Sequence, residues 1–350
     1  MRLRTAPGGP GTPGAPYLVF LHIPKTGGKT VAAILHHHYG DAFRGGIGAD
    51  AETPAEHRIP NAFSRVDRMD ARVRQLAANP SVRAVAAHIT FGVRDRFPPE
   101  ARWLTVLRDP VERTLSQYHF LLPDRSRGRV TGRGFVPPWL PPPTSELTLA
   151  ECLGEAGYIP DNLQTRMLCG LVSPHDPMPQ NALEQAMRNL GEQFAFVGTT
   201  ERLPEFLALL NVAFGWPSVA YKRSKYAGIP QQRKLLPPDF LRVVEERNTL
   251  DRELYRYAEG LFDRALMEAG PELQAEIDVL ARAERTRRER ERGDAADGID
   301  ALRALPLSAR VDLALKEADL AEARLQVRRL RSRIKWRLGA RQEDHDLTVR

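Results

Sequence analysis

Residues 20–30 read Phe-Leu-His-Ile-Pro-Lys-Thr-Gly-Gly-Lys-Thr. An apolar run leads into this stretch and predicts a buried strand, and the residues after it repeat their apolar positions with the period of a helix. A turn between a strand and a helix presents unpaired backbone N–H groups, and the helix dipole favours an anion there. Gly27 and Gly28 allow a phosphate to approach the backbone closely, and Lys25 supplies a cation. The stretch therefore predicts a phosphate-binding loop.

The wider pattern of apolar runs predicts the fold class. Four short runs read as buried strands, at 17–22, 82–87, 103–107 and 194–198. Helical patterns separate or follow them, and one long helix is expected over 238–269. Strands that alternate with helices favour an α/β fold with a mainly parallel sheet. We therefore expect a P-loop-like parallel sheet flanked by helices.

A second motif follows the strand predicted at 103–107. Arg108 comes directly after that strand, at the end where open α/β sheets bind their ligands. Asp109 is a good N-cap and Pro110 is suited to the first helical position. Ser116 lies about two turns into the predicted helix. An arginine fork with a hydroxyl group can hold a second, separate phosphate.

The phosphate loop also resembles part of a Walker A motif, G-x-x-x-x-G-K-[ST]. Gly28, Lys29 and Thr30 match the end of that motif, but Ile23 stands where its first glycine is required. A P-loop nucleotide kinase or NTPase is therefore an alternative function. For the loop itself, an ordinary strand–helix turn is the alternative. A second alternative function is a non-catalytic scaffold that uses the basic tail for assembly or membrane contact.

Changes in composition divide the 350-residue chain into three parts. Residues 1–16 are rich in Gly and Pro and are expected to be a flexible N-terminus. Residues 17–270 contain the predicted strands and form the main domain. Residues 271–350 are densely charged, and a weak heptad pattern predicts a helical, partly disordered tail with some coiled-coil character. Every formal charge within 324–341 is positive.

Composition limits the class of partner and the compartment. The formal net charge of +7 favours an anionic partner. Two cysteines are too few for a disulfide framework or a thiolate zinc site, and we see no metal-binding spacing. The sequence shows no signal peptide and no run of 18 apolar residues. We expect a cytoplasmic protein whose basic C-terminal helix is a candidate for peripheral membrane contact or self-association.

Together the two motifs resemble the sulfotransferases that use 3′-phosphoadenylyl sulfate (PAPS). The likeness runs over 17–269 and is greatest to the branch of heparan sulfate 2-O-sulfotransferase and its bacterial relatives. It implies the sulfotransferase fold, and transfer of a sulfuryl group from PAPS to a hydroxyl group, with a carbohydrate as the expected acceptor. It implies no metal and no nucleic-acid partner.

The resemblance also implies which residues hold the nucleotide. In that family the Pro-Lys-Thr loop binds the 5′-phosphosulfate, and the Arg and Ser of R-D-P-x-E-R-x-x-S bind the 3′-phosphate. The matching residues here are Lys25, Thr26, Gly27, Gly28, Lys29, Thr30, Arg108 and Ser116. Apart from the resemblance, a basic segment near the end of the domain includes Arg233 and Lys234. It is a candidate to close over the 3′-phosphate or to meet an anionic acceptor, and a solvated surface is the alternative.

The resemblance further implies a catalytic base. His88 follows the strand predicted at 82–87, where the family carries two histidines, and Ala86 stands at the first of those positions. An unperturbed imidazole is half neutral near pH 6.5 and can accept a proton from a hydroxyl group. We predict His88 as the base and Lys25 as the cation that stabilises the departing phosphate, although a structural histidine at the edge of the core is the alternative for His88.

Three more residues are candidates for binding the acceptor. His22 lies just before the phosphate loop, so it either faces the acceptor or simply ends the strand. Asn162 and Gln164 belong to a second region of family likeness, Asp-Asn-Leu-Gln at 161–164.

Overall fold

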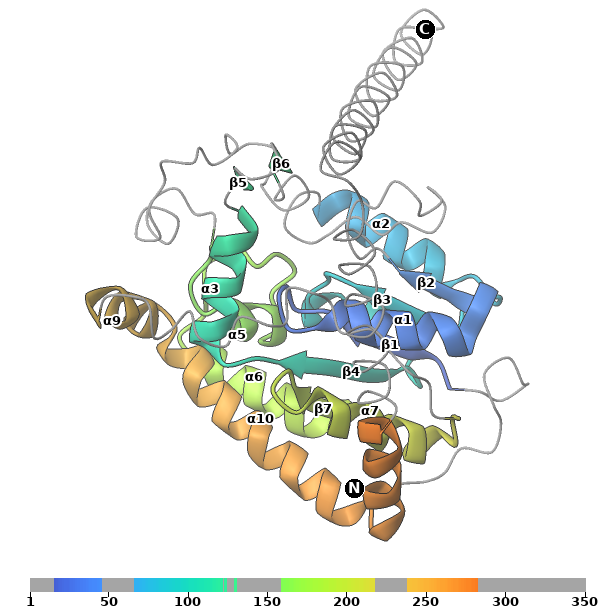
Figure 1. Ribbon diagram of the computed structural model, residues 1–350. Coiled ribbons are helices and arrows are strands. Elements are labelled where there is room, and N and C mark those ends of the chain that lie inside the picture. The colour runs from blue at the N-terminus through green and yellow to red at the C-terminus, as the bar shows by residue number, and fades with distance from the viewer. Residues whose placement is uncertain are drawn as a thin grey trace, which may run out of the picture. The chain divides into compact units, whose positions relative to one another are not determined.

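The computed structural model describes residues 16–45, 66–121, 123–124, 129–130, 159–217 and 238–282. Their main feature is a five-stranded, wholly parallel sheet with strand order β2-β3-β1-β4-β7 (Figure 1). The strands are β1 (Leu18–Leu21), β2 (Phe43–Gly45), β3 (Ala84–Ala87), β4 (Arg102–Leu107) and β7 (Phe194–Thr199). A separate antiparallel pair joins β5 (Pro123–Asp124) to β6 (Arg129–Val130). The predicted α/β fold with a parallel sheet is confirmed.

The central strand β1 shows why the sheet is buried on both faces. Val19 and Leu21 point into one core, and Leu18 and Phe20 point into the other, because successive side chains of a strand alternate. All four side chains are fully buried. Such continuous apolar runs are typical of parallel strands covered on both sides.

Helices cover both faces of the sheet. The first face packs against α2 (Val66–Ala77), η3 (Phe91–Arg96), α5 (Leu163–Leu168) and α6 (Ala182–Gln193). The second face packs against α1 (Gly28–Tyr39) and α7 (Leu203–Phe214). Helix α10 (Thr249–Glu268) contacts β7 and contributes side chains to both cores. The chain outside the sheet thus shields it from water on each side.

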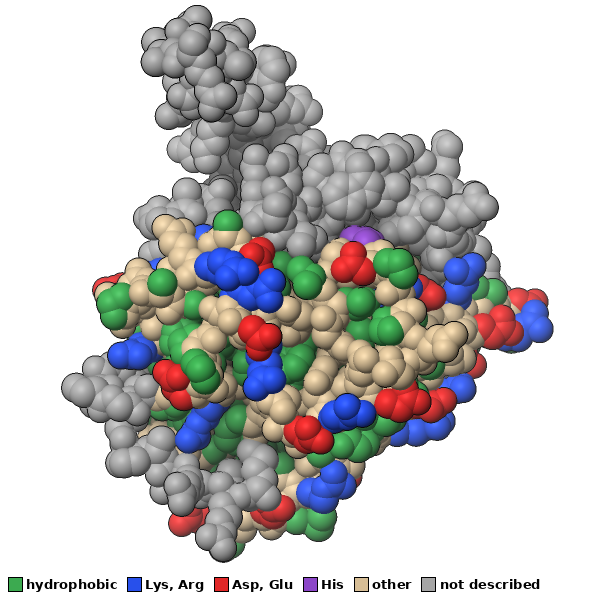
Figure 2. All heavy atoms as spheres, turned by 180° about the vertical axis from the view of Figure 1, so that it is seen from behind, with side chains coloured by type: hydrophobic (Ala, Val, Ile, Leu, Met, Phe, Trp, Pro, Cys, Tyr) green, Lys and Arg blue, Asp and Glu red, His purple; other side chains and the backbone are tan. Residues whose placement is uncertain are grey.

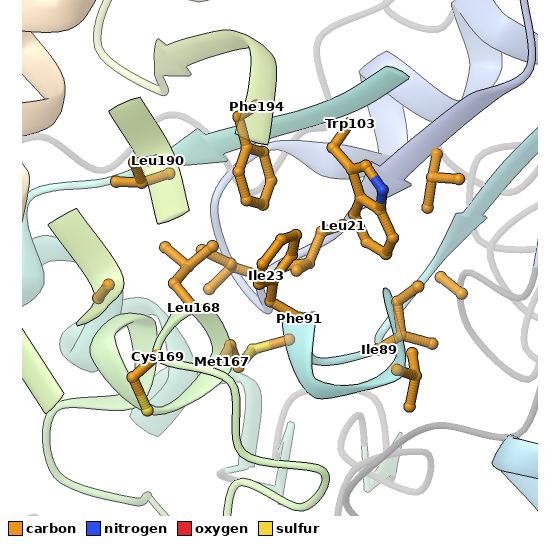
Figure 3. Packing of buried hydrophobic residues seen from close by; sticks show 14 of the residues in the cluster. Leu21, Ile23, Ile89, Phe91, Trp103, Met167, Leu168, Cys169, Leu190 and Phe194 are labelled. Atoms are coloured by element: carbon orange, nitrogen blue, oxygen red, sulfur yellow. The ribbon is translucent and has the colours of Figure 1, made fainter. Parts of the chain in front are cut away.

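Aromatic rings form the centre of the first-face core. The ring of Phe91 lies 5.2 Å from the ring of Trp103 and 5.2 Å from that of Phe194. Figure 3 shows Leu21 and Ile23 packed beside them. Ile23, which lies between β1 and the predicted phosphate loop, is fully buried. This packing therefore fixes the chain where it enters the loop.

Two sequence predictions about single elements differ from the structure. Strand β2 was missed because its three residues are half-exposed and form no apolar run. The helix predicted over 238–269 is two helices, α9 (Pro238–Arg247) and α10, separated by Asn248. The backbone of Asn248 is not helical, with φ −127° and ψ 35°.

The end of the described chain is also helical, over 271–282. Leu273 and Leu280 are buried in the second-face core. The predicted domain boundary after residue 270 stays a prediction, as do the flexible N-terminus and the coiled-coil tail, which fall outside the described residues. In the described part of the chain, no helix is both long enough and apolar enough to cross a membrane.

Candidate functional site

Three predicted site residues lie where neighbouring strands end. His22 follows β1, His88 follows β3 and Arg108 follows β4, and the next strand, β7, ends beside them at Thr199. Because the strands are parallel and adjacent, their carboxyl ends share one edge of the sheet. The topology therefore brings together the two motifs and the predicted base.

The phosphate loop is shaped by its own backbone and by Thr26. Lys25 has φ 72° and Gly27 has φ 80°, both in the left-handed region that favours glycine. The hydroxyl of Thr26 donates to the carbonyl of Ile23 at 2.8 Å, and the N–H of Thr30 donates to the carbonyl of Gly27 at 3.0 Å. Thr26 and Thr30 are buried, so in this structure they shape the loop.

Ile23 explains why the loop departs from a Walker A motif. Its side chain is buried in the first-face core, where Figure 3 shows it beside Leu21 and Phe91. A glycine there would leave this part of the core unfilled. Residue 23 therefore has a packing role in this loop, whereas a Walker A motif requires a glycine at the same position.

Gly28 is required by the close approach of His22. A Cβ atom added at residue 28 would lie 1.9 Å from Cδ2 and 2.2 Å from Nε2 of the His22 ring. The ring therefore fills the space beneath the first turn of α1. Burial, with the charges of His88, Lys29 and Lys25, holds the pKa of His22 well below its usual range.

The two histidines stack as a consequence of strand register. Leu21 lies opposite Ala87, so His22 and His88 are the next neighbours, and their ring centroids are 4.2 Å apart. His88 Nδ1 lies 2.7 Å from the carbonyl oxygen of His22. A carbonyl only accepts hydrogen bonds, so Nδ1 carries the proton and Nε2 of the neutral ring is the basic atom.

The ionisation of His88 differs from the sequence expectation. Burial lowers its pKa to about 4, and the charges of Lys25 and Lys29 act in the same direction, while the bond to His22 opposes them. The expected ionisation near pH 6.5 is therefore corrected downward. His88 is neutral at physiological pH, which is the form that accepts a proton.

Positive charge concentrates around the loop. Burial, together with the cations of Arg108, Lys29 and Arg113, lowers the pKa of Lys25 to about 8. Lys29 is exposed, whereas Arg113 is fully buried. By contrast, basic and acidic side chains are interspersed over the face seen in Figure 2. A cluster of like charges is suited to a ligand that carries several negative charges.

Arg108 joins the second motif to the first. Its Nη1 donates to the carbonyl of Lys25 at 3.1 Å, and its Nη2 lies 3.7 Å from a carboxylate oxygen of Glu112. Asp109 Oδ1 accepts from the backbone N–H of Glu112 at 3.0 Å, so the predicted N-cap of α3 (Pro110–Leu121) is confirmed. Ser116 is half-buried on α3.

Asn162 and Gln164, the predicted acceptor-binding residues, are buried. Asn162 Oδ1 accepts from the N–H groups of Leu250 and Asp251 at 2.9 and 3.1 Å, which caps α10. Both ends of the Gln164 amide bond to the backbone of Arg108. These contacts are within the protein, and the acceptor-binding role stays a prediction. Arg233 and Lys234 lie outside the described residues.

Sequence reasoning missed two buried charges near the site. Arg113 is fully buried, and its Nε and Nη1 have no hydrogen-bond partner among the described residues. Asp251 is fully buried and accepts from the N–H groups of Gln164 and Thr165. Arg113 lies on the opposite side of the predicted helix from the apolar Val111 and Leu115, so the helical pattern gave no signal for its burial. Within the described ranges, no group of three His, Cys, Asp or Glu side chains could hold a metal ion.

Comparison with known proteins gives a family and several relatives. Residues 3–305 match the family described as Galactose-3-O-sulfotransferase. Heparan-sulfate 6-O-sulfotransferase 1 of Homo sapiens is 31% identical over 195 residues, which cover 48% of this chain and 45% of the relative. Heparan sulfate 2-O-sulfotransferase 1 of Gallus gallus is 28% identical over 193 residues, 51% of this chain and 52% of the relative. The chain spans about half the length of these curated relatives.

These matches bear on two expectations from the sequence. The resemblance to PAPS-dependent sulfotransferases is confirmed, while the particular likeness to the 2-O branch stays a prediction because 6-O enzymes match as well. The expected cytoplasmic location is wrong: the matched relatives are animal sulfotransferases named for heparan sulfate, and that relationship contradicts a cytoplasmic assignment.

Proposed function

Because the chain belongs to the sulfotransferase family that its residues 3–305 match, we propose that it transfers a sulfuryl group from PAPS to a hydroxyl group of a carbohydrate. The observation that carries the proposal is the meeting of the phosphate loop, Arg108 and neutral His88 at one edge of the sheet. The names of the relatives, which act on heparan sulfate, support a glycan as the acceptor.

The residues at this edge fit an anionic nucleotide. The cations of Lys25 and Arg108 lie close enough together that Arg108 lowers the pKa of Lys25. The buried Nε of Arg108 has no hydrogen-bond partner among the described residues, although Nη2 of the same side chain lies 3.7 Å from a carboxylate oxygen of Glu112. We assign the 5′-phosphosulfate to the loop of residues 25–30, where backbone N–H groups at the start of α1 accompany Lys25. We assign the 3′-phosphate to Arg108 and Ser116. Arg233 and Lys234 remain candidates for the same phosphate.

Each catalytic residue has one task in the proposed reaction. Bound PAPS would supply the sulfuryl group and a phosphate leaving group. Nε2 of His88 accepts the proton of the acceptor hydroxyl as its oxygen bonds to sulfur. Lys25 and the loop N–H groups stabilise the negative charge that develops on the phosphate oxygen as its bond to sulfur breaks. No metal is required in this scheme, since the cations of the chain face the developing charge.

Labelled sulfate tests the proposed function directly. The protein is incubated with ³⁵S-labelled PAPS and a panel of glycans that includes heparan and galactose-terminated chains. We expect label to appear on at least one glycan, with release of adenosine 3′,5′-bisphosphate (PAP). Calorimetry with PAP and with ATP–Mg²⁺ provides the comparison for a kinase or NTPase. Tight binding of ATP–Mg²⁺ without binding of PAP would overturn the proposal.

The two phosphate assignments can be tested separately. Arg108→Ala should weaken PAP binding about ten- to a hundredfold, which corresponds to one charge-assisted hydrogen bond. Binding of AMP, which lacks the 3′-phosphate, should fall less, because it loses only the support that Arg108 gives to the carbonyl of Lys25. Equal losses for the two ligands would refute the assignment of Arg108 to the 3′-phosphate.

A further inference from the structure

We infer that Gln164 is a positioning residue, which holds Arg108 and, through it, the phosphate loop in the arrangement that binds the nucleotide. The inference rests on the proposed function. It concerns a residue that touches neither nucleotide nor acceptor, and it gives Gln164 a different role from the acceptor binding suggested by its sequence context.

The side chain of Gln164 clamps the backbone of Arg108. Its Oε1 accepts from the N–H of Arg108 at 2.9 Å, and its Nε2 donates to the carbonyl of Arg108 at 2.9 Å. Gln164 is fully buried, and both polar ends of its amide are engaged. A substrate would have to break these bonds in order to reach the amide, which argues for a role within the protein.

The clamp acts just beyond the end of β4. Leu107 is the last residue of that strand, and its carbonyl accepts from the N–H and the hydroxyl of Thr200. Arg108 is the next residue and is not paired with a strand. Without the Gln164 amide, the N–H and the carbonyl of Arg108 would lose these two hydrogen bonds. The Gln164 side chain thus makes the two backbone hydrogen bonds that a neighbouring strand would make, although it is 56 positions from Arg108 in the chain.

Gln164 is itself held firmly from α10. Its backbone N–H donates to Oδ2 of Asp251 at 3.0 Å, while Thr165 donates to Oδ1 through its N–H at 2.7 Å and its hydroxyl at 2.8 Å. In the other direction, the side chain of Asn162, just before α5, caps α10. The starts of α5 and α10 therefore cap each other, and this pair of helices forms a rigid base for the clamp.

From Arg108 the connection continues to the phosphate loop. Nη1 of Arg108 donates to the carbonyl of Lys25 at 3.1 Å. Asp251, Gln164, Arg108 and Lys25 thus form one hydrogen-bonded series from the core to both proposed phosphate sites. A binding group that is held in place before the ligand arrives loses less entropy on binding, and a displacement of about 1 Å can cost much of its contribution.

The experiment compares two amide side chains, the buried Gln164 of α5 and the half-buried Asn189, which bonds to α5. Gln164→Met removes the clamp and keeps a similar size. Asn189→Leu is the matched control, because Asn189 Nδ2 donates to the carbonyl of Leu168 at the other end of α5, at 2.7 Å. Calorimetry measures the dissociation constants of PAP and AMP for each protein. We expect the preference for PAP over AMP to fall about tenfold or more in Gln164→Met, and to stay within about twofold of wild type in Asn189→Leu.

A second variant covers the case in which Gln164→Met does not fold. Gln164→Glu keeps an oxygen for the N–H of Arg108 but loses the donor to its carbonyl, and its preference for PAP should also fall. An unchanged preference in a folded Gln164 variant, or an equal fall in Asn189→Leu, would overturn the positioning role. Failure of the wild-type protein to prefer PAP over AMP would instead overturn the proposed function, and with it this inference.

Discussion

The lowered pKa of Lys25 predicts that PAP binding weakens as the pH rises above 8. The free protein has a pKa of about 8 at Lys25 because burial and the charges of Arg108, Lys29 and Arg113 disfavour its protonated form. Phosphate groups next to Lys25 favour that form, so its pKa rises when PAP binds. Affinity is therefore greatest below the pKa of the free protein and declines above it.

The size of the effect follows from this linkage. Between the pKa of the free protein and that of the complex, each pH unit lowers the affinity by about tenfold, or about 1.4 kcal/mol. At about pH 9 most free molecules have a neutral Lys25, so PAP binding should take up close to one proton. At about pH 7 the uptake should be small. The second ionisation of a phosphate lies near pH 6 and contributes little in this range.

Calorimetry in buffers of different ionisation enthalpy measures the proton uptake. Lys25→Arg is the matched variant, because an arginine keeps its charge throughout this range. We expect the variant to bind PAP without proton uptake at about pH 9 and with a flatter pH dependence. A wild-type affinity that is constant from about pH 7 to 9.5, or an uptake that persists in Lys25→Arg, would refute the reasoning.

Three further predictions concern the base, the loop and the domain end. His88→Ala should bind PAP almost normally while transfer falls about 10²- to 10⁴-fold. On the acid side, wild-type kcat/KM should decline as the pH falls through about 4, where His88 becomes protonated. Gly28→Ala should lower the melting temperature, because the new Cβ meets the His22 ring, and an added His22→Ala change should restore part of the loss. Truncation after residue 282 should leave a domain that is folded by circular dichroism. Truncation after residue 270 removes two buried leucines and should lower the free energy of unfolding, measured in urea, by about 3–6 kcal/mol.

The sheet, and the edge at which the candidate site residues lie, were predictable because their signals are local. Each main strand is a short apolar run, and the residues that follow it, such as His88 and Arg108, stand where parallel strands end together. The phosphate loop was likewise visible from its glycines and its lysine. These features depend on neighbours in the sequence, and a single sequence displays them.

The roles of Asn162, Gln164 and Asp251 could not be predicted in the same way. Their partners are 56 to 89 positions away, and no periodicity connects the two ends of such contacts. Asp251 appears in the sequence as an ordinary acid within the helix predicted over 238–269, and only the structure places it in the first turn of α10. In the structure it caps a different helix, α5, from across the core.

The same edge of the sheet contains several groups that weaken a folded protein. Nδ1 of His22, Nε of Arg108, and Nε and Nη1 of Arg113 are buried without hydrogen-bond partners among the described residues. A buried polar atom without a partner costs about 1–3 kcal/mol, so four of them near one another are unfavourable for stability alone. Burial is the main cause of the lowered pKa values of Lys25 and Arg113, and repulsion from neighbouring cations acts in the same direction, while Asp251 opposes it at Arg113. A ligand with several negative charges relieves that repulsion. The buried atoms without partners and the clustered cations are therefore an independent physical reason to propose that the nucleotide binds here.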